Sequence, residues 1–94
     1  MKNQYFVYIL TGRNNQVLYI GVTNNIERRS IEHKQGNIPG FSKKYNLYKI
    51  VYCEEFRSIK DAIYREKQIK NWHRQWKLDL ITKNNPQWKD LSRG

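Results

Sequence analysis

Near its N-terminus the chain alternates two short apolar runs with polar segments. Residues 4–10 and 17–22 are rich in aromatic and branched side chains, and residues 11–16 between them contain glycine, threonine and asparagine. Such runs favour β-strands, because aromatic and β-branched side chains pack well on a pleated surface, and the polar residues between them favour a turn. The pattern therefore predicts a β-hairpin.

The expected pairing of these strands brings two tyrosines together. A symmetric turn sets Leu10 against Val17, and Tyr8 then lies directly across from Tyr19. Directly opposed residues have Cβ atoms roughly 5 Å apart on one face of the sheet. A register slip of one residue would separate the two side chains, so this expectation depends on the register.

A helix from about Asn25 to Gln35 is expected after the hairpin. Thr23, Asn24 and Asn25 offer N-cap candidates, and Gly36 is a typical C-terminal stop. Helical spacing sets four residues on one side, namely Ile26, Arg29, Ser30 and His33. An arginine and a histidine one turn apart therefore project together from a broad, partly polar inward side.

Residues 36–46 form a loop-like stretch with Pro39 and Gly40 as breakers of regular structure. Lys43 and Lys44 form a charge pair within it. The pair either contacts a phosphate backbone or lies on a solvated loop, and the sequence leaves both alternatives open.

The second half of the chain predicts one more strand and two helical segments. Residues 47–53 indicate a strand covered on both faces, because polar and apolar residues do not alternate cleanly. Residues 58–73 begin with a capping-box pattern and continue as a helix, and a second or bent helix follows to about residue 83. Trp72 and Trp76 are expected in the core, and Trp88 with Leu91 indicates a tail folded back onto the body.

Glu66 lies within the apolar stripe expected for the helix over residues 58–73. That stripe consists of Ile59, Ala62, Ile63 and Ile69. An inward-facing carboxylate is costly unless it is paired or binds a cation. Its partner is therefore either Lys70, one helical turn later, or a metal ion.

The composition makes the chain strongly basic. Its 94 residues include 18 Lys+Arg and 8 Asp+Glu, for a formal net charge of +10. Residues 1–47 contain 7 basic and 2 acidic side chains and residues 48–94 contain 11 and 6, an excess of five in each half. The length indicates a single domain over residues 1–94, and the evenly spread charge favours a nucleic-acid partner over a merely high isoelectric point.

Cysteine usage and the N-terminus indicate a cytoplasmic protein. The single Cys53 excludes an intrachain disulfide and a multi-cysteine zinc site, and it is expected to be inert within an apolar strand. The N-terminal apolar run is too short for a signal peptide or a membrane span, so no membrane partner is expected.

The polar residues gathered in this way suit hydrolysis of a phosphodiester with one divalent cation. A tyrosine hydroxyl whose pKa is lowered by cationic neighbours can take a proton from water. Glu66 can hold Mg²⁺ or Mn²⁺, loosely in the absence of substrate, and Arg29 can stabilise negative charge that develops on the phosphate. Taken singly, each residue also has an ordinary structural interpretation, such as packing of the tyrosine pair.

The same residues carry a family resemblance. The chain resembles the GIY-YIG nuclease motif in the order and spacing of Tyr8, Tyr19-Ile20-Gly21, Arg29 and His33. It also resembles the compact single-domain, UPF0213-like group of that family in residues 64–72 and in the closing residues 84–88. The resemblance implies an α+β fold in which a three-stranded antiparallel sheet is flanked by helices in the order β-β-α-β-α-α. The first motif triplet departs from the pattern, because it reads Phe6-Val7-Tyr8 and lacks its glycine.

The resemblance also implies roles for site residues. Tyr8 would be the general base with Tyr19 assisting or substituting, Arg29 would stabilise the scissile phosphate, His33 would support Tyr8 or the phosphate, and Glu66 would bind the metal. We further expect nucleic-acid contacts at Gly21, Lys43, Lys44 and Asn85, although Asn84 is an alternative for the last position.

The leading functional hypothesis is a metal-dependent endonuclease that acts on DNA, structure-directed or weakly specific, with a role in DNA repair or recombination. An unknown protein partner would bring it to its target. One alternative is a basic nucleic-acid-binding module of the same fold that does not cut. A protein-interaction adaptor ranks third, because it leaves the arginine, the histidine and the glutamate without a shared purpose.

Overall fold

The computed structural model describes residues 3–37 and 40–92, and Pro39 lies outside them. Its elements in chain order are β1 (Tyr5–Thr11), β2 (Leu18–Thr23), α1 (Ile26–Lys34), α2 (Phe41–Lys44), β3 (Lys49–Phe56), α3 (Ile59–Asn71) and α4 (Arg74–Asn84). The strands form an antiparallel sheet in the order β2-β1-β3. The expected fold class and order β-β-α-β-α-α are confirmed, and the one-turn helix α2 is an addition within the stretch expected as a loop.

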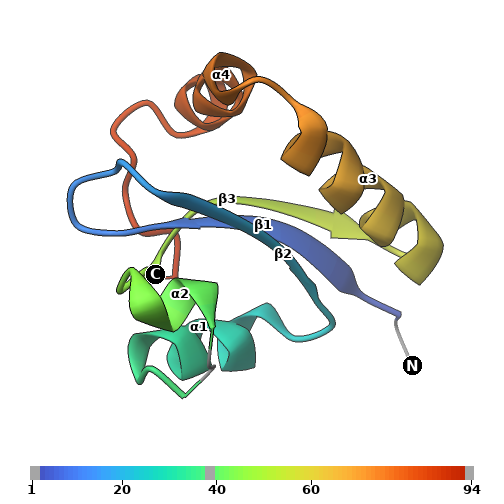
Figure 1. Ribbon diagram of the computed structural model, residues 1–94. Helices are drawn as coiled ribbons and strands as arrows, with labels where there is room; N and C mark the ends of the chain where they lie inside the picture. Colours follow the sequence, from blue (N-terminus) through green and yellow to red (C-terminus); the bar gives the residue numbers. More distant parts are fainter. Residues whose placement is uncertain (1–2, 38–39, 93–94) are drawn as a thin grey trace.

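Helices cover both faces of the sheet (Figure 1): α3 and α4 lie above it, and α1 and α2 lie below it. The upper core joins residues from all three strands to the two long helices: Val7, Ile9, Ile20, Val51, Tyr52, Ala62, Ile69 and Ile81. The lower core consists of Tyr8, Leu10, Leu47 and Ile50, with Tyr19 and Ile26 packed against it. Alternate residues of β1 therefore point into the two different cores.

The polar residues expected to cap α1 and α3 do so. The side chain of Asn25 accepts a hydrogen bond from the Arg28 N–H at 3.0 Å, and α1 ends at the C-cap Gln35. The Ser58 hydroxyl accepts one from the Asp61 N–H at 3.4 Å at the start of α3. These side chains satisfy backbone donors that have no partner within the helix, which fixes where each helix begins.

The hairpin register differs from the expected one. Tyr8 lies opposite Gly21, and Tyr19 lies opposite Leu10, so the expected direct pairing of the two tyrosines is wrong. The turn begins one residue later than expected, because Thr11 continues β1 and donates its hydroxyl proton to the Val17 carbonyl at 2.9 Å. Every residue of β1 is therefore paired two positions further along β2 than expected, with Leu10 opposite Tyr19 in place of Val17. A shift of two keeps both tyrosines on one face, where they are diagonal neighbours.

Strand β3 begins and ends later than the expected 47–53. A bulge in its pairing with β1 sets Ile9 opposite Tyr52 and Leu10 opposite Ile50, which leaves Val51 as an extra residue. The bulge accounts for the missing alternation, because three consecutive residues are buried. Burial on both faces holds only for this stretch, since alternate residues from Cys53 onward are exposed.

Helices α3 and α4 bury less apolar surface than expected. In α3, Ala62 and Ile69 are fully buried, but Ile59 and Ile63 are exposed because they lie at the margins of the inward face. Trp72 packs against the upper core as expected, whereas Trp76 is 55% exposed and lies outside it. Within the described residues, no helix has the length and apolar content needed to cross a membrane.

The C-terminal tail folds back onto the sheet, as expected. Trp88 packs against the upper core, and the Leu91 N–H donates to the Ile50 carbonyl at 2.7 Å. Asp90 accepts a hydrogen bond from the Ile50 N–H at 3.2 Å and pairs with Lys34 of α1 at 3.2 Å. The tail thus ties β3 to α1.

Candidate functional site

Three aromatic rings from separate elements meet beneath the sheet. The ring centroids of Tyr8 on β1 and Tyr19 on β2 are 6.3 Å apart, and His33 of α1 lies 5.8 Å from the first and 6.0 Å from the second. Tyr8 and His33 are buried, and Tyr19 is half-buried. The structure therefore brings together three of the residues predicted to form the site.

Gly21 provides the space for this cluster. A Cβ atom added to it would lie 2.6 Å from the Tyr8 hydroxyl oxygen and 2.9 Å from Cε2 of Tyr19. Both distances are shorter than atoms tolerate, so a larger residue would displace the rings. Gly21 is buried and was expected to contact nucleic acid, whereas the structure shows it making room for the tyrosines.

Tyr8 and His33 share a hydrogen bond in which the Tyr8 hydroxyl oxygen lies 3.1 Å from Nε2. Burial and the neighbouring Tyr19 raise the pKa of Tyr8 well above its usual value, and Arg29 offsets this only in part. The expectation of a lowered tyrosine pKa is therefore wrong, because loss of water disfavours phenolate more strongly than one cation favours it. Burial and Arg29 lower the pKa of His33, so its imidazole is neutral at pH 7.

Arg29 lies at the margin of the ring cluster. Its Nε is 3.6 Å from a carboxylate oxygen of Glu32, which is too long for a hydrogen bond. In the described part of the chain, this Nε is a buried donor without a hydrogen-bond partner. Glu32 was not among the predicted site residues, although its position three residues after Arg29 on one helix indicates the pair.

Glu66 lies on α3, which covers the opposite face of the sheet from α1 (Figure 1). Its side chain is 16% exposed, and its carboxylate pairs with Lys70 one turn later at 2.8 Å. Its negative charge makes the smallest of the contributions that raise the pKa of Tyr8. Of the two partners considered for Glu66 from the sequence, the structure shows Lys70, and the metal ion stays a prediction.

The donor atoms near Glu66 bear on how a divalent cation would be held. Among the described residues, no group of three histidine, cysteine or acidic side chains is placed to hold a metal ion. Mg²⁺ nevertheless keeps several waters and often binds through one or two carboxylates together with substrate phosphates. A lone carboxylate fits such a cation only when a phosphate completes the site, and Lys70 must then give up its contact.

The other predicted nucleic-acid residues lie outside the ring cluster. Lys43 and Lys44 are exposed on α2. The amide of Asn85 is buried, donates to the Val51 and Lys89 carbonyls at 3.1 and 2.8 Å, and accepts from the Lys89 N–H at 3.1 Å. These bonds give it a structural role, and a contact with nucleic acid would require breaking them. Asn84 is exposed and bonds only within its own helix.

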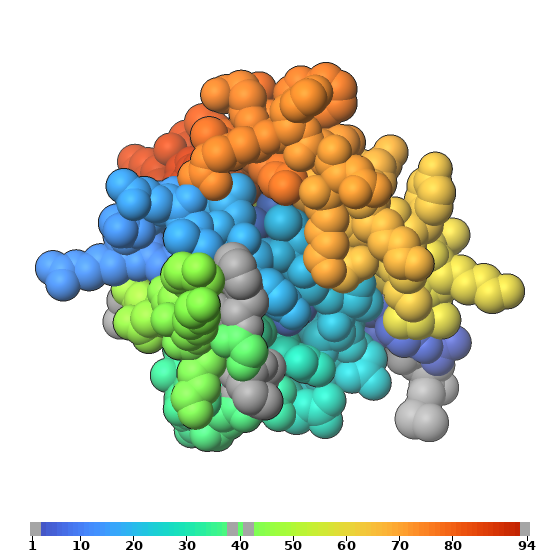
Figure 2. All heavy atoms as spheres, in the orientation of Figure 1, coloured from blue at the N-terminus to red at the C-terminus, as the bar shows by residue number. Residues whose placement is uncertain are grey.

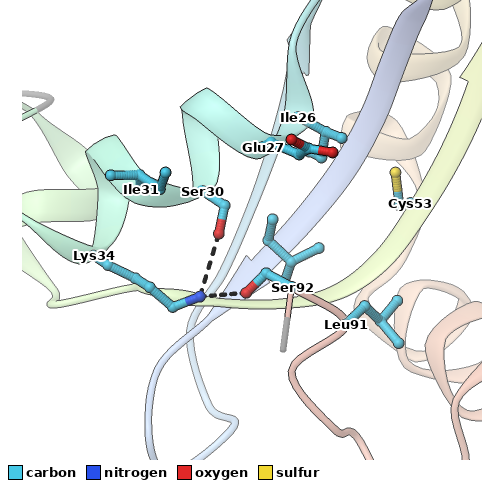
Figure 3. A pocket seen from close by; sticks show the side chains of 9 residues that line it. Ile26, Glu27, Ser30, Ile31, Lys34, Cys53, Leu91 and Ser92 are labelled. Atoms are coloured by element: carbon cyan, nitrogen blue, oxygen red, sulfur yellow. Dashed lines mark hydrogen bonds between the residues drawn. The ribbon is translucent and has the colours of Figure 1, made fainter. Parts of the chain in front are cut away.

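A separate cleft of about 560 Å³ lies between α1, β3 and the tail, and Ser30 lines it instead of joining the ring cluster (Figure 3). Lys34 spans the cleft from α1, with hydrogen bonds to Ser30 at 3.2 Å and to Ser92 of the tail. Cys53 also lines the cleft and is exposed as a residue, and partial loss of water around its thiol, helped by Glu55 and Glu54, raises its pKa to about 11. The thiol is therefore protonated at neutral pH, which makes it a weak nucleophile.

Known proteins share both the sequence pattern and the fold. Residues 4–79 match the GIY-YIG catalytic domain. A UPF0213 protein of Staphylococcus haemolyticus is 37% identical over 78 residues, which cover 83% of this chain and 94% of the relative. Another, from Syntrophus aciditrophicus, is 40% identical over 83 residues, which cover 87% and 93%. The solution structure of a UPF0213 protein from Bacillus halodurans, 23% identical, has a similar fold with a TM-score of 0.59 over 93% of this chain and 92% of that chain. The chain therefore belongs to the GIY-YIG nuclease family and resembles its UPF0213 members.

Proposed function

We propose that this protein is an endonuclease that hydrolyses phosphodiester bonds in DNA with the help of Mg²⁺ or Mn²⁺, and that it is structure-directed or weakly sequence-specific. The observation that carries the proposal is the contact of three rings from β1, β2 and α1, and the charges of Arg29 and Glu66 support it. Tyr8, Tyr19 and His33 are in mutual contact, and the charges of Arg29 and Glu66 both act on Tyr8. These groups come from four different elements, which packing of one hairpin does not require.

The hydrogen bond between Tyr8 and His33 supports a proton relay. When Nδ1 carries the imidazole proton, Nε2 accepts the hydroxyl proton of Tyr8. As a water oxygen bonds to phosphorus, its proton passes to the Tyr8 oxygen while the Tyr8 proton passes to His33, and the leaving oxygen departs from phosphorus. A neutral His33 makes this transfer feasible without prior formation of a phenolate.

Arg29 and Glu66 would support the same reaction from either side. The Arg29 side chain is 32% exposed, and its guanidinium suits a phosphate oxygen that gains charge in the transition state. Glu66 would hold the cation, which when bound neutralises phosphate charge and the developing charge on the leaving oxygen. Lys70, the present partner of this carboxylate, is exposed and can turn to solvent or to a phosphate.

Cleavage of labelled branched, nicked and linear DNA tests the proposal. With Mg²⁺ or Mn²⁺ we expect Tyr8→Phe to lower the cleavage rate by about 10²- to 10⁴-fold, and Glu66→Gln to abolish the cation-stimulated cleavage. Tyr5→Phe is the matched control, because Tyr5 lies on the same strand but packs against the upper core.

The pH dependence of the same assay tests the role of His33. Because the pKa of His33 is lowered, its imidazole takes up a proton only below about pH 6.5, and the wild-type cleavage rate should fall there. The variant His33→Gln should lack this fall in rate at acid pH.

Two results would count against the proposal. Cleavage that survives both Tyr8→Phe and Glu66→Gln would exclude the proposed site. Salt-sensitive binding by the wild type without any cut product, in either metal, would support the non-cleaving module of the same fold.

A further inference from the structure

An exposed aromatic surface lies where α3 meets α4. We call it the tryptophan corner and define it as Trp72, His73 and Trp76. The ring of Trp76 meets those of Trp72 and His73 edge to face, with centroids 6.1 and 5.5 Å away. Trp72 is in turn packed against the upper core and lies beneath the guanidinium of Arg65 at 5.1 Å. The indole of Trp76 is thus held in place by its neighbours while 55% of the residue remains exposed.

The charges around the tryptophan corner favour a polyanion. Lys70, Arg74 and Lys77 lie within a few residues of the exposed indole along the chain. Arg74 also donates to the Gln16 carbonyl, which ties the start of α4 to the hairpin loop. The nearby carboxylates are those of Glu66, paired with Lys70, and Asp79, which accepts a hydrogen bond from Gln75 at 2.9 Å. An exposed aromatic ring among cations is the combination that binds nucleic-acid bases by stacking.

The tryptophan corner lies close to the candidate site along α3. Trp72 follows Glu66 by six positions, which corresponds to about 9 Å along the axis of α3 at 1.5 Å per residue, and Trp76 lies in the first turn of α4. Figure 2 shows the atoms of this segment, in orange, on the same face as those of the hairpin and α2.

From this arrangement we propose that Trp76 stacks on an unpaired base close to the scissile phosphate. Within a duplex each base face is covered by its neighbours, so an indole can stack only on a base at an end, gap, flap or branch. The proposed endonuclease would therefore select DNA with single-stranded character next to the cut. This inference rests on the proposed function, to which it adds the class of substrate.

A binding experiment without divalent cations tests the inference independently of cleavage. The probes are a blunt duplex and the same duplex extended by a short single strand that contains 2-aminopurine. We expect Trp76→Ala to weaken binding of the extended duplex by roughly 5- to 150-fold, while binding of the blunt duplex changes less than twofold. Quenching of 2-aminopurine fluorescence, which reports stacking, should be lost in Trp76→Ala and kept in Trp76→Phe. Tyr64→Ala is the matched control, because Tyr64 is an exposed aromatic on the outer side of α3.

Each remaining result bears on the inference. The inference would be overturned if Trp76→Ala weakened binding of both probes equally or of neither probe. It would also be overturned if Tyr64→Ala weakened binding more than Trp76→Ala does. These results leave the proposed endonuclease standing, since that is tested by cleavage. Failure of the wild type to bind any DNA would overturn both proposals. Circular dichroism of each variant confirms that a loss of binding is not a loss of folding.

Discussion

Gly21 lies opposite Tyr8 in the hairpin, and the absence of a side chain there lets two tyrosine rings approach the backbone of β2. The structure thus requires glycine at this position for a steric reason. It is the clearance for the rings that matters, since φ is not in the left-handed region at this position. The candidate site therefore depends on a residue with no functional group of its own.

We predict that Gly21→Ala destabilises the protein and disturbs the ring cluster. A Cβ atom 2.6 Å from the Tyr8 hydroxyl oxygen forces the ring to move, and such overpacking costs about 1 to 3 kcal/mol of unfolding free energy. Urea unfolding measures the loss, and the cleavage rate should fall as well. Gly12→Ala is the control, because a Cβ there would meet its nearest neighbours at 3.4 Å. Equal destabilisation by the two substitutions would contradict the steric explanation.

For a single side chain, the sequence predicts the sheet face on which it lies more reliably than its pKa or its hydrogen bonds. Tyr8 and Tyr19 lie on the same face as expected, because a register shift of two residues preserves the alternation of side chains between the faces. The direction of the Tyr8 pKa was not predictable, since it depends on how completely α1 covers the ring. The hydrogen bond to His33 likewise depends on the angle at which that helix packs.

Among the elements, the C-terminal tail is held to β3 by Asn85. Its side chain makes three hydrogen bonds, one to the Val51 carbonyl and two to the backbone of Lys89. Asp90 adds a further connection. Burial acts to raise the pKa of this carboxyl, but hydrogen bonds from Ser92, Lys34 and the Ile50 N–H outweigh it and lower the pKa. The carboxylate consequently stays ionised near neutral pH and holds the tail against both β3 and α1.

We predict that Asn85→Ala lowers the free energy of unfolding by about 1 to 3 kcal/mol, because it leaves buried backbone groups without partners. Asn84→Ala is the matched control, and we expect a change within about 0.5 kcal/mol for this exposed residue. Urea unfolding of both variants gives the comparison. A loss of DNA affinity in Asn85→Ala at full stability would instead restore the expected contact with nucleic acid.

Element types followed from the sequence, whereas several boundaries and the packing of the long helices did not. The caps at Asn25 and Ser58 are local signals and lie at the predicted positions. The bulge at Val51 and the later start of β3 arise from pairing with β1, which no local pattern encodes. Trp76 was expected in the core on grounds of size, but α4 turns it outward.

Across the whole molecule, the basic excess is the same in both halves of the chain, so many surfaces could attract DNA. The hairpin, α2 and the junction of α3 with α4 nevertheless share one face (Figure 2). Lys43 and Lys44 of α2 are exposed. The sequence left two alternatives for this pair, a phosphate contact and a solvated loop.

The salt dependence of DNA binding distinguishes these alternatives. Each phosphate neutralised by the protein contributes a slope of about −0.9 to a plot of log affinity against log salt concentration. We predict that replacing Lys43 and Lys44 by alanine makes this slope shallower by about 1 to 2, because both ammonium groups would release counterions on binding. Replacing Lys60 and Lys67, exposed on α3, removes the same charge from another surface and should leave the slope nearly unchanged. Equal slopes for the two double variants would mean that net charge, and not a defined path across α2, governs binding.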